Sequence, residues 1–251
     1  MYPIVFTIPF IDLPISSFGL MMATAFLVGT WITAIRMREE GLDPELATTL
    51  LLYVMLGGVA GSKLYYAVDV SIREGLPFTS LLFARDGITW YGGLIAGVAV
   101  CAVGCRIHRV PITTFMNCCA VSVALGQAIG RIGCFLVGDD YGHVTDVPWA
   151  VSFPLGAPPT HELVHPTQLY EVAWLLPVAF YLWKRRRTSA FLFGEYMVLN
   201  GIGRIGIEIW RVNERVFLGM TEAQWIGAAL TIAGLSTLAY FSRARRRALE
   251  A

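Results

Sequence analysis

Seven apolar segments of about 20 residues divide almost the whole chain, and an apolar helix of this length crosses a bilayer. Hydrophobic residues make up 56% of the 251 residues and charged residues only 15%, against about 25% charged in soluble domains. We therefore predict an all-α integral membrane protein with about seven transmembrane helices in a single domain, residues 1–251. The predicted spans are 16–36, 48–69, 88–107, 112–136, 167–183, 191–210 and 222–241.

Basic residues at the span ends predict the orientation. Clusters of Lys and Arg follow the first, third, fifth and seventh predicted spans and hold twelve of the nineteen basic residues. With an odd number of spans, the four clusters share one side, which the positive-inside rule makes cytoplasmic. We therefore expect the N-terminus outside, the C-terminus in the cytoplasm, and the longest connection, about 137–166, facing outward. The clusters are Arg36 and Arg38, Arg106 and Arg109, Lys184 to Arg187, and Arg243 to Arg247.

The remaining composition argues against several classes of protein. Almost nothing is left for a soluble domain, and we expect no nucleic-acid partner. The five cysteines lie in or beside apolar segments and show no Cys-x-x-Cys or Cys/His spacing, so neither a metal site nor a disulfide framework is expected. The N-terminal segment lacks a basic region and a cleavage site, so it is not read as a cleavable signal peptide. Its three prolines predict an extended or interfacial lead-in.

Two arginines interrupt the apolar segments. Arg204 lies within 191–210, and Arg131 lies within 127–136. A buried arginine at bilayer depth costs at least ~2.5–3.5 kcal/mol. A chain that carries two of them is expected to use them on an anion.

The segment around Arg204 carries further polar residues at helical spacing. Asn200, Glu208 and Arg211 follow the spacings of four and three that place side chains on one helix face. In the functional interpretation, Glu208 holds Arg204 or Arg211 while an arginine faces the ligand. The alternative is a structural ion pair to another helix.

Glycines surround Arg131, and an acidic turn, Gly138 to Gly142, follows it. Glycine lets a headgroup approach the backbone closely, and a guanidinium grips a phosphate with two parallel hydrogen bonds. In the structural alternative, Arg131 only pairs with Asp139 or Asp140.

Two shorter motifs carry polar side chains at expected outer span ends. His165 to Glu171 opens the fifth predicted span, with proline at a position that suits a helix start. Trp90 to Ile95 opens the third and contains Tyr91 beside two glycines, Gly92 and Gly93. For each motif, a ligand site and an ordinary structural or interfacial role stay open.

Together these runs resemble the bacterial phosphatidylglycerol–prolipoprotein diacylglyceryl transferases. They occur in the family's order and reach from the third span to the sixth. The matching stretches are Tyr91 to Ile95, Gly130 to Gly133 with Gly138 to Gly142, His165 to Glu171, and Arg204 to Arg211.

The resemblance implies transfer of a diacylglyceryl group from phosphatidylglycerol to the lipobox cysteine of prolipoproteins, with release of glycerol phosphate. It implies no metal or cofactor, and as partners the lipid bilayer, phosphatidylglycerol and prolipoprotein signal peptides. The expected location is the bacterial cytoplasmic (inner) membrane, with the active site facing outward. The implied catalytic or lipid-binding residues are Arg131, Gly142, Arg204, Glu208, Arg211, His165, Gln168, Tyr170, Gly92 and Gly93.

Four positions depart from the family pattern. Tyr91 stands where histidine is common, Cys134 where asparagine is common, Asp139 where glutamate is common, and Phe18 where tyrosine is common. The general base therefore remains open between Tyr91, Asp139 and His165. An anion transporter or channel, and a catalytically silent lipid-binding paralogue, are the alternative functions.

Overall fold

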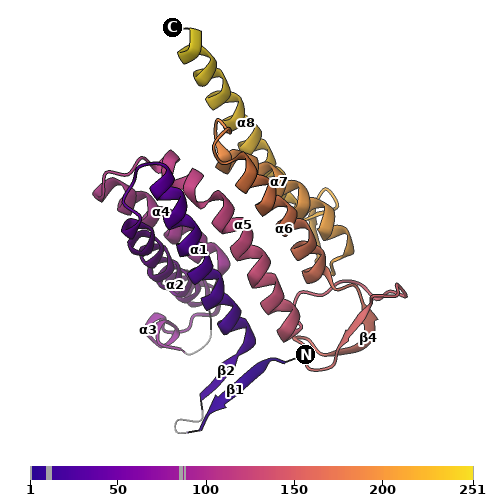
Figure 1. Ribbon diagram of the computed structural model, residues 1–251. Helices are drawn as coiled ribbons and strands as arrows, with labels where there is room; N and C mark the ends of the chain where they lie inside the picture. The colour runs from indigo at the N-terminus through magenta and orange to yellow at the C-terminus, as the bar shows by residue number, and fades with distance from the viewer. Residues whose placement is uncertain (1, 10–12, 85–86, 88, 251) are drawn as a thin grey trace. The chain divides into compact units, whose positions relative to one another are not determined.

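The computed structural model describes residues 2–9, 13–84, 87 and 89–250, and most of these residues are helical (Figure 1). Each of the seven predicted segments coincides with a long helix, and one short helix, α3, is added within the described residues. The helices are α1 (Ser17–Glu39), α2 (Glu45–Glu74), α3 (Phe78–Leu82), α4 (Trp90–Ile107), α5 (Ile112–Val137), α6 (Thr167–Arg185), α7 (Leu192–Ile207) and α8 (Glu222–Glu250), with a 3-10 turn, η1 (Glu208–Trp210), after α7.

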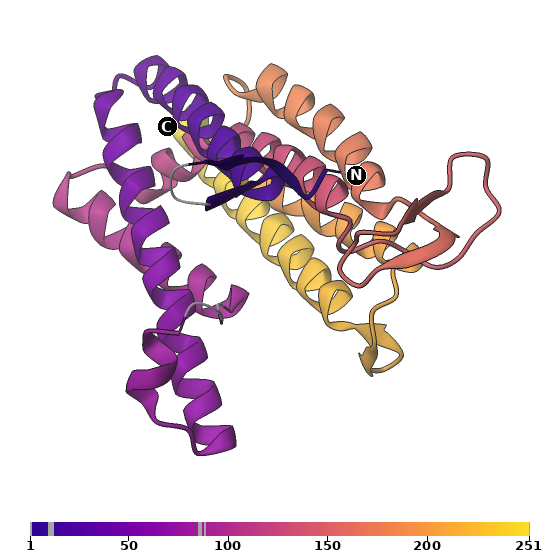
Figure 2. The same ribbon diagram turned by 90° about the horizontal axis from the view of Figure 1, so that it is seen from below.

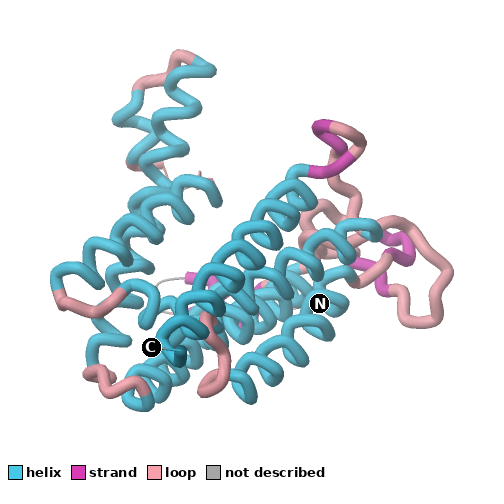
Figure 3. Tube along the Cα trace, turned by 90° about the horizontal axis from the view of Figure 1, so that it is seen from above, coloured by secondary structure: helices cyan, strands magenta, loops and turns pink. Residues whose placement is uncertain are grey.

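Three antiparallel two-stranded hairpins correct the all-α prediction. Figure 3 shows these strands in magenta, next to helix ends and loops. The first hairpin forms the N-terminal lead-in, where prolines and β-branched residues favour extended backbone. The strands are β1 (Ile4–Ile8), β2 (Leu13–Ser16), β3 (Val151–Phe153), β4 (Thr160–Val164), β5 (Arg215–Phe217) and β6 (Met220–Thr221).

Four helices, α1, α2, α5 and α8, are long and apolar enough to cross a membrane, judged by length and composition among the described residues. α4 is apolar but shorter. α7 has 16 residues, about 24 Å at 1.5 Å per residue, which is less than the ~30 Å hydrocarbon core. The structure supports a multi-pass membrane protein, while seven spans and the orientation of the termini stay predictions.

The chain forms two compact units. One contains residues 1–32 and 116–251, and the other contains residues 33–115, so the two boundaries fall within α1 and α5. The first unit holds Arg131, Arg204, Arg211 and the loop 137–166, and the second holds α2, α3 and α4. A single domain over 1–251 stays a prediction.

In the first unit, α5, α6 and α7 enclose an apolar core that includes Val121, Leu182 and Leu192. α7 and α8 pack closely because small residues face each other. A Cβ on Gly201 would lie 2.4 Å from the backbone oxygen of Gly227. This packing fixes the face of α7 that carries Arg204. Figure 1 shows α6, α7 and α8 running alongside one another.

In the second unit, α2 and α4 also approach closely through glycine. A Cβ on Gly92 would lie 2.4 Å from the backbone oxygen of Gly61, and one on Gly93 would lie 2.4 Å from Ser62 Oγ. Close helix packing therefore accounts for both glycines. Their predicted role in lipid binding stays a prediction.

Candidate functional site

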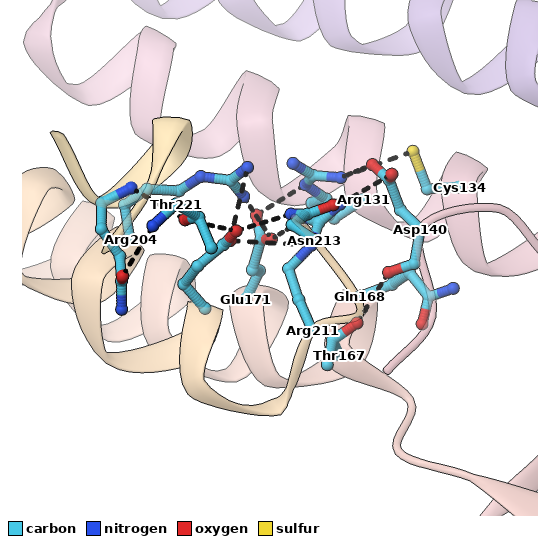
Figure 4. Close-up of polar contacts among 12 residues, drawn as sticks. Arg131, Cys134, Asp140, Thr167, Gln168, Glu171, Arg204, Arg211, Asn213 and Thr221 are labelled. Carbon is cyan, nitrogen blue, oxygen red and sulfur yellow. Dashed lines mark hydrogen bonds and ion pairs between the residues drawn. The ribbon is translucent and has the colours of Figure 1, made fainter. Parts of the chain in front are cut away.

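Three arginines from separate parts of the chain converge on one carboxylate, that of Glu171 on α6. Arg131 Nε on α5 lies 2.6 Å from Glu171 Oε2. Arg204 Nη1 on α7 and Arg211 Nη1 lie 2.9 and 3.1 Å from Oε1. Figure 4 shows Glu171 between Arg204 on one side and Arg131 and Arg211 on the other. Glu171 is buried, so these contacts act in a medium of lower dielectric than water.

Asp140 supplies a second bridge in the cluster. Its two carboxylate oxygens each lie 2.7 Å from a guanidinium nitrogen, one from Arg131 and the other from Arg211. Its backbone adopts φ +60°, a left-handed conformation that Asp tolerates better than most residues. The acidic turn after α5 therefore aims this carboxylate back at the arginines.

Glu208 is buried at the end of α7, and its carboxylate accepts hydrogen bonds from β6 and from the segment between η1 and β5. Thr221 and Asn213 donate hydrogen bonds of 2.8 and 2.6 Å to its Oε1. Its Oε2 lies 3.8 Å from nitrogens of Arg204 and Arg211 and has no hydrogen-bond partner among the described residues. The closer holder of both arginines is Glu171.

The predicted helical stripe is interrupted. α7 ends at Ile207, and Arg211 follows η1 with extended backbone, so Arg211 is not on the helix face that its spacing predicted. Its side chain nevertheless reaches Glu171 and Asp140. The inter-helix ion pair that sequence analysis left open for this segment is present, between Arg204 and Glu171.

The three arginines differ in side-chain exposure and in how many of their nitrogens contact carboxylates. The Arg211 side chain is 5% exposed and contacts three carboxylates. Arg131 and Arg204 are 21% and 26% exposed. Among the described residues, Arg131 Nη2 and Arg204 Nε donate no hydrogen bond to a carboxylate. Arg131 and Arg204 can therefore accept an added anion, while Arg211 mainly positions the carboxylates.

Hydrogen bonds join the start of α6 to the acidic turn. The Thr167 hydroxyl donates to the backbone oxygen of Asp140 at 2.7 Å, and the Gln168 amide donates to that of Asp139. The Gly142 amide donates to the backbone oxygen of His165 at 2.9 Å. The motif 165–171 and the turn 138–142 thus form one connected structure.

Gly142 allows three segments to meet. A Cβ at this position would lie 2.2 Å from the backbone oxygen of Trp210, 2.8 Å from Thr167 Cγ2 and 2.9 Å from His165 Cβ. The first of these neighbours is backbone and cannot rotate away. The close approach gives a physical reason for glycine here, and a direct contact with lipid stays a prediction.

The two aspartates of the turn have opposite electrostatic environments. Burial raises the pKa of Asp139, against the lowering effects of a Cys134 hydrogen bond and of Arg131 and Arg211. Burial alone would also raise the pKa of Asp140, but Arg211 and Arg131 outweigh it and hold that pKa below its ordinary value. Asp140 is therefore a fixed anion, and Asp139 is the more readily protonated carboxylate.

His165 belongs to a group of aromatic side chains around Tyr170. Its Nδ1 lies 2.9 Å from the Tyr170 hydroxyl, and Trp149 Nε1 donates to the same hydroxyl at 2.7 Å. Tyr170 also meets Trp210 edge to face, with ring centroids 5.7 Å apart. Tyr91 lies in the second unit and is partly exposed, so its predicted role stays a prediction.

One group of possible metal ligands lies at the edge of the cluster. Ligand atoms of Cys134, Asp139 and Asp140 lie within 4.8 Å of one another. Arg131 Nη1 already bonds Asp140 Oδ2 at 2.7 Å and lies 3.9 Å from Cys134 Sγ. A cation would compete with this guanidinium for the same carboxylate, so the donor set does not favour a metal.

The sequence pattern did not indicate Glu171 as the central residue, although it stands at the end of the polar run 165–171. A carboxylate one helical turn after Thr167, inside an otherwise apolar span, was the available signal. Asp140 was considered only as a partner for Arg131. Both residues act across the fold, where local spacing gives no information.

Comparisons with known proteins match this chain along nearly its full length. The family model described as prolipoprotein diacylglyceryl transferase matches residues 3–240. Proteins named phosphatidylglycerol–prolipoprotein diacylglyceryl transferase are similar to it. One from Nostoc sp. is 29% identical over 88% of this chain and 84% of its own length. One from Parasynechococcus marenigrum is 32% identical over 78% and 76%, and one from Clostridium tetani is 29% identical over 94% and 96%.

Proposed function

Because the chain belongs to the prolipoprotein diacylglyceryl transferase family, we propose that it transfers the diacylglyceryl group of phosphatidylglycerol to the lipobox cysteine thiol of prolipoproteins. Glycerol phosphate is released, and the reaction is the first step of lipoprotein maturation. The relatives' names give the activity and both substrates. They lend no support to the two alternatives, an anion transporter and a silent paralogue.

The observation that carries this function is the presence of two partly exposed arginines, Arg131 and Arg204, beside the buried Arg211. Arg131 and Arg204 bind the lipid phosphate through guanidinium nitrogens not committed to carboxylates. Glu171 holds both arginines at fixed positions. Such preorganised donors stabilise charge that develops during reaction.

The reaction breaks one bond and forms one. The cysteine sulfur attacks the glyceryl carbon that carries the phosphate ester, the carbon–oxygen bond breaks, and its electron pair stays on the phosphate oxygen. Arg131 and Arg204 stabilise that oxygen as negative charge accumulates there. The thiol proton passes to a base. Asp139 is favoured over Tyr91 because burial raises the carboxyl pKa and because a tyrosine, with an ordinary pKa of about 10, is a poor proton acceptor.

His165 remains the second candidate for the base. Its Nδ1 is engaged by Tyr170, which leaves the other ring nitrogen for proton transfer. Gln168 and Tyr170 support the lipid site indirectly, by fixing the turn and His165. We place the site at the outer face of a bacterial inner membrane, because the basic clusters lie at the opposite ends of the spans.

Arginine-to-lysine substitution at positions 131 and 204 tests whether the two guanidinium groups bind the lipid phosphate through paired donors. Lysine keeps the charge but loses the planar pair of donors, so each variant should lose about 10²–10³ in kcat. Release of glycerol phosphate from labelled phosphatidylglycerol, with a lipobox peptide as acceptor, measures the loss. Arg215→Lys is the matched control, because Arg215 is exposed on β5. Full activity in both test variants would show that paired guanidinium donors are not needed to bind the phosphate.

Complementation tests the activity as a whole. The wild-type chain should restore growth to a bacterial strain depleted of its own transferase, and Arg204→Ala should not. Failure of the wild-type chain, despite normal expression in the membrane, would favour the silent lipid-binding paralogue.

A further inference from the structure

An apolar cavity of about 630 Å³ lies between α6 and α7, away from the carboxylate-bridged arginines. Its walls include Ala173 and Trp174 on α6 and Ile202, Gly206 and Ile207 on α7. This volume lies within the range of small-molecule sites, about 300–1,000 Å³. The proposed reaction uses His165 at the edge of this cavity but not its apolar walls.

A connected group of polar side chains lines one part of the cavity. His165, Tyr170 and Trp149 line its loop end and are joined through the Tyr170 hydroxyl. When that hydroxyl donates its proton to His165 Nδ1, the histidine carries its own proton on Nε2. In this tautomer His165 is not the base, and its N–H is a suitable donor to an ester carbonyl. The cavity is thus polar at the loop and apolar along the helices.

Gly206 leaves the cavity open. A Cβ built on this residue has no neighbouring heavy atom within 4 Å, apart from its own helix backbone and chain neighbours. Gly203, one turn earlier, differs, because a Cβ there would lie 2.1 Å from Trp174 Nε1. Close packing therefore accounts for Gly203 but not for Gly206.

We propose that this cavity binds an acyl chain of a membrane phospholipid, with the ester group at His165. An acyl chain has no polar groups to satisfy. A peptide segment would bring backbone N–H and C=O groups against apolar walls, and each unpaired group is costly in that setting. Tyr170 and Gly203 directly precede Glu171 and Arg204, so the acyl site lies on faces of α6 and α7 that adjoin the faces carrying the arginine site.

A cavity-filling substitution, Gly206→Phe, tests the proposal, which relies on the proposed function for its choice of phosphatidylglycerol as probe. Purified full-length protein is assayed with dioctanoyl and dioleoyl phosphatidylglycerol and a lipobox peptide. A longer chain makes more van der Waals contacts with the cavity walls, so we expect the wild type to prefer the long-chain lipid. Gly206→Phe should reduce this preference in kcat/KM at least tenfold and keep short-chain activity within twofold.

Two controls separate cavity filling from a general effect of bulk. Ala229→Phe adds the same ring at an exposed position of α8 and should keep the wild-type preference. Should Gly206→Phe fail to fold, Ile202→Trp narrows the cavity from its partly exposed side and should have the same effect.

A binding readout that needs no turnover completes the test. Phosphatidylglycerol with a photoactivatable group near the end of one acyl chain should crosslink to residues 202–207, at least fivefold less in Gly206→Phe. Unchanged chain preference and unchanged crosslinking would overturn the proposal. A raised KM for the peptide alone would assign the cavity to the peptide and overturn it as well. Crosslinking in a wild-type protein that shows no turnover would refute the proposed function but not the acyl site.

Discussion

Glu171 determines how the three arginines are arranged, because it is the carboxylate that all three share. Three guanidinium groups gathered in a partly buried cluster repel one another strongly unless anions lie between them. Glu171 and Asp140 supply these anions from two different segments. A residue that sequence reasoning left out of the site is thus central to its electrostatics.

Neutralising Glu171 should damage both stability and activity. We expect Glu171→Gln to lower the free energy of unfolding by about 3 kcal/mol, because removing one partner of a buried charge group leaves the others uncompensated. Thermal unfolding in detergent and glycerol phosphate release measure the two effects. Glu162→Gln, at an exposed position of β4, is the control. A variant with wild-type melting temperature and wild-type activity would show that Glu171 is dispensable.

Asp140 should make stability depend on pH in the acidic range. Its pKa is lower in the folded protein than in the unfolded chain, so its stabilising effect is complete above the unfolded value of about 3.9. That effect is lost as the pH falls below this value toward the lowered folded pKa. Asp140→Asn is a suitable comparison, because asparagine also tolerates φ +60°.

The melting temperature of the wild type should therefore exceed that of Asp140→Asn at pH 7, and the gap should shrink as the pH falls from 5 to 3. Differential scanning fluorimetry in one detergent across this range measures it. A gap that does not change with pH would mean that the arginines do not stabilise the Asp140 carboxylate.

At the scale of elements, the hairpin between α7 and α8 contains a hydrogen bond that supports the arginine site and also a strained turn. Thr221 on β6 holds Glu208, so the hairpin supports the arginine site. Its two-residue turn, Leu218 and Gly219, has φ of +48° and +71°. Positive φ at both positions is typical of a type I′ turn, in which Asn-Gly is preferred and leucine is unfavourable.

Replacing the turn leucine should therefore stabilise the protein. We expect Leu218→Asn to raise the free energy of unfolding by about 1 kcal/mol, since the left-handed conformation costs leucine about that much. Thermal or denaturant unfolding in detergent measures the change. Val216→Asn, on the adjoining strand and also exposed, should not stabilise. Destabilisation by Leu218→Asn would mean that the leucine side chain makes a contact worth more than the backbone strain.

At the scale of the whole molecule, the distribution of basic residues predicts the orientation in the membrane. Within the first unit, the basic ends of α6 and α8 lie together, since Arg245 Nη1 donates to the backbone oxygen of Thr188 at 2.8 Å. Figure 2 shows the loop with β3 and β4 extending beyond the end of α6 that is opposite this basic end. This separation of basic ends from the polar loop agrees with the predicted topology.

Reporter fusions test that topology directly. Alkaline phosphatase inserted at Leu155, an exposed loop position, should be active, and green fluorescent protein after Ala251 should be fluorescent. The exchanged pair, with each reporter at the other position, should be silent. The reverse pattern would place the arginine site on the cytoplasmic side and contradict the proposed location.

The sequence by itself determined the features that depend on local composition. Apolar length and helical period predicted all seven long helices, because a helix in an apolar medium satisfies its backbone internally. Basic clusters predicted the orientation, and the high cost of Arg131 and Arg204 in apolar surroundings marked them as candidate ligand-binding residues. The four motifs also indicated the family that the comparisons then showed.

Only the tertiary structure decided which charges meet. Glu171 and Arg211 are 40 residues apart, and no local spacing encodes such a pairing. The spacing of Arg211 even predicted the wrong geometry, because α7 ends at Ile207 before the stripe is complete. The arginine site therefore depends on how α5, α6, α7 and the acidic turn pack, since ion pairs form between whichever groups packing brings within about 3 Å.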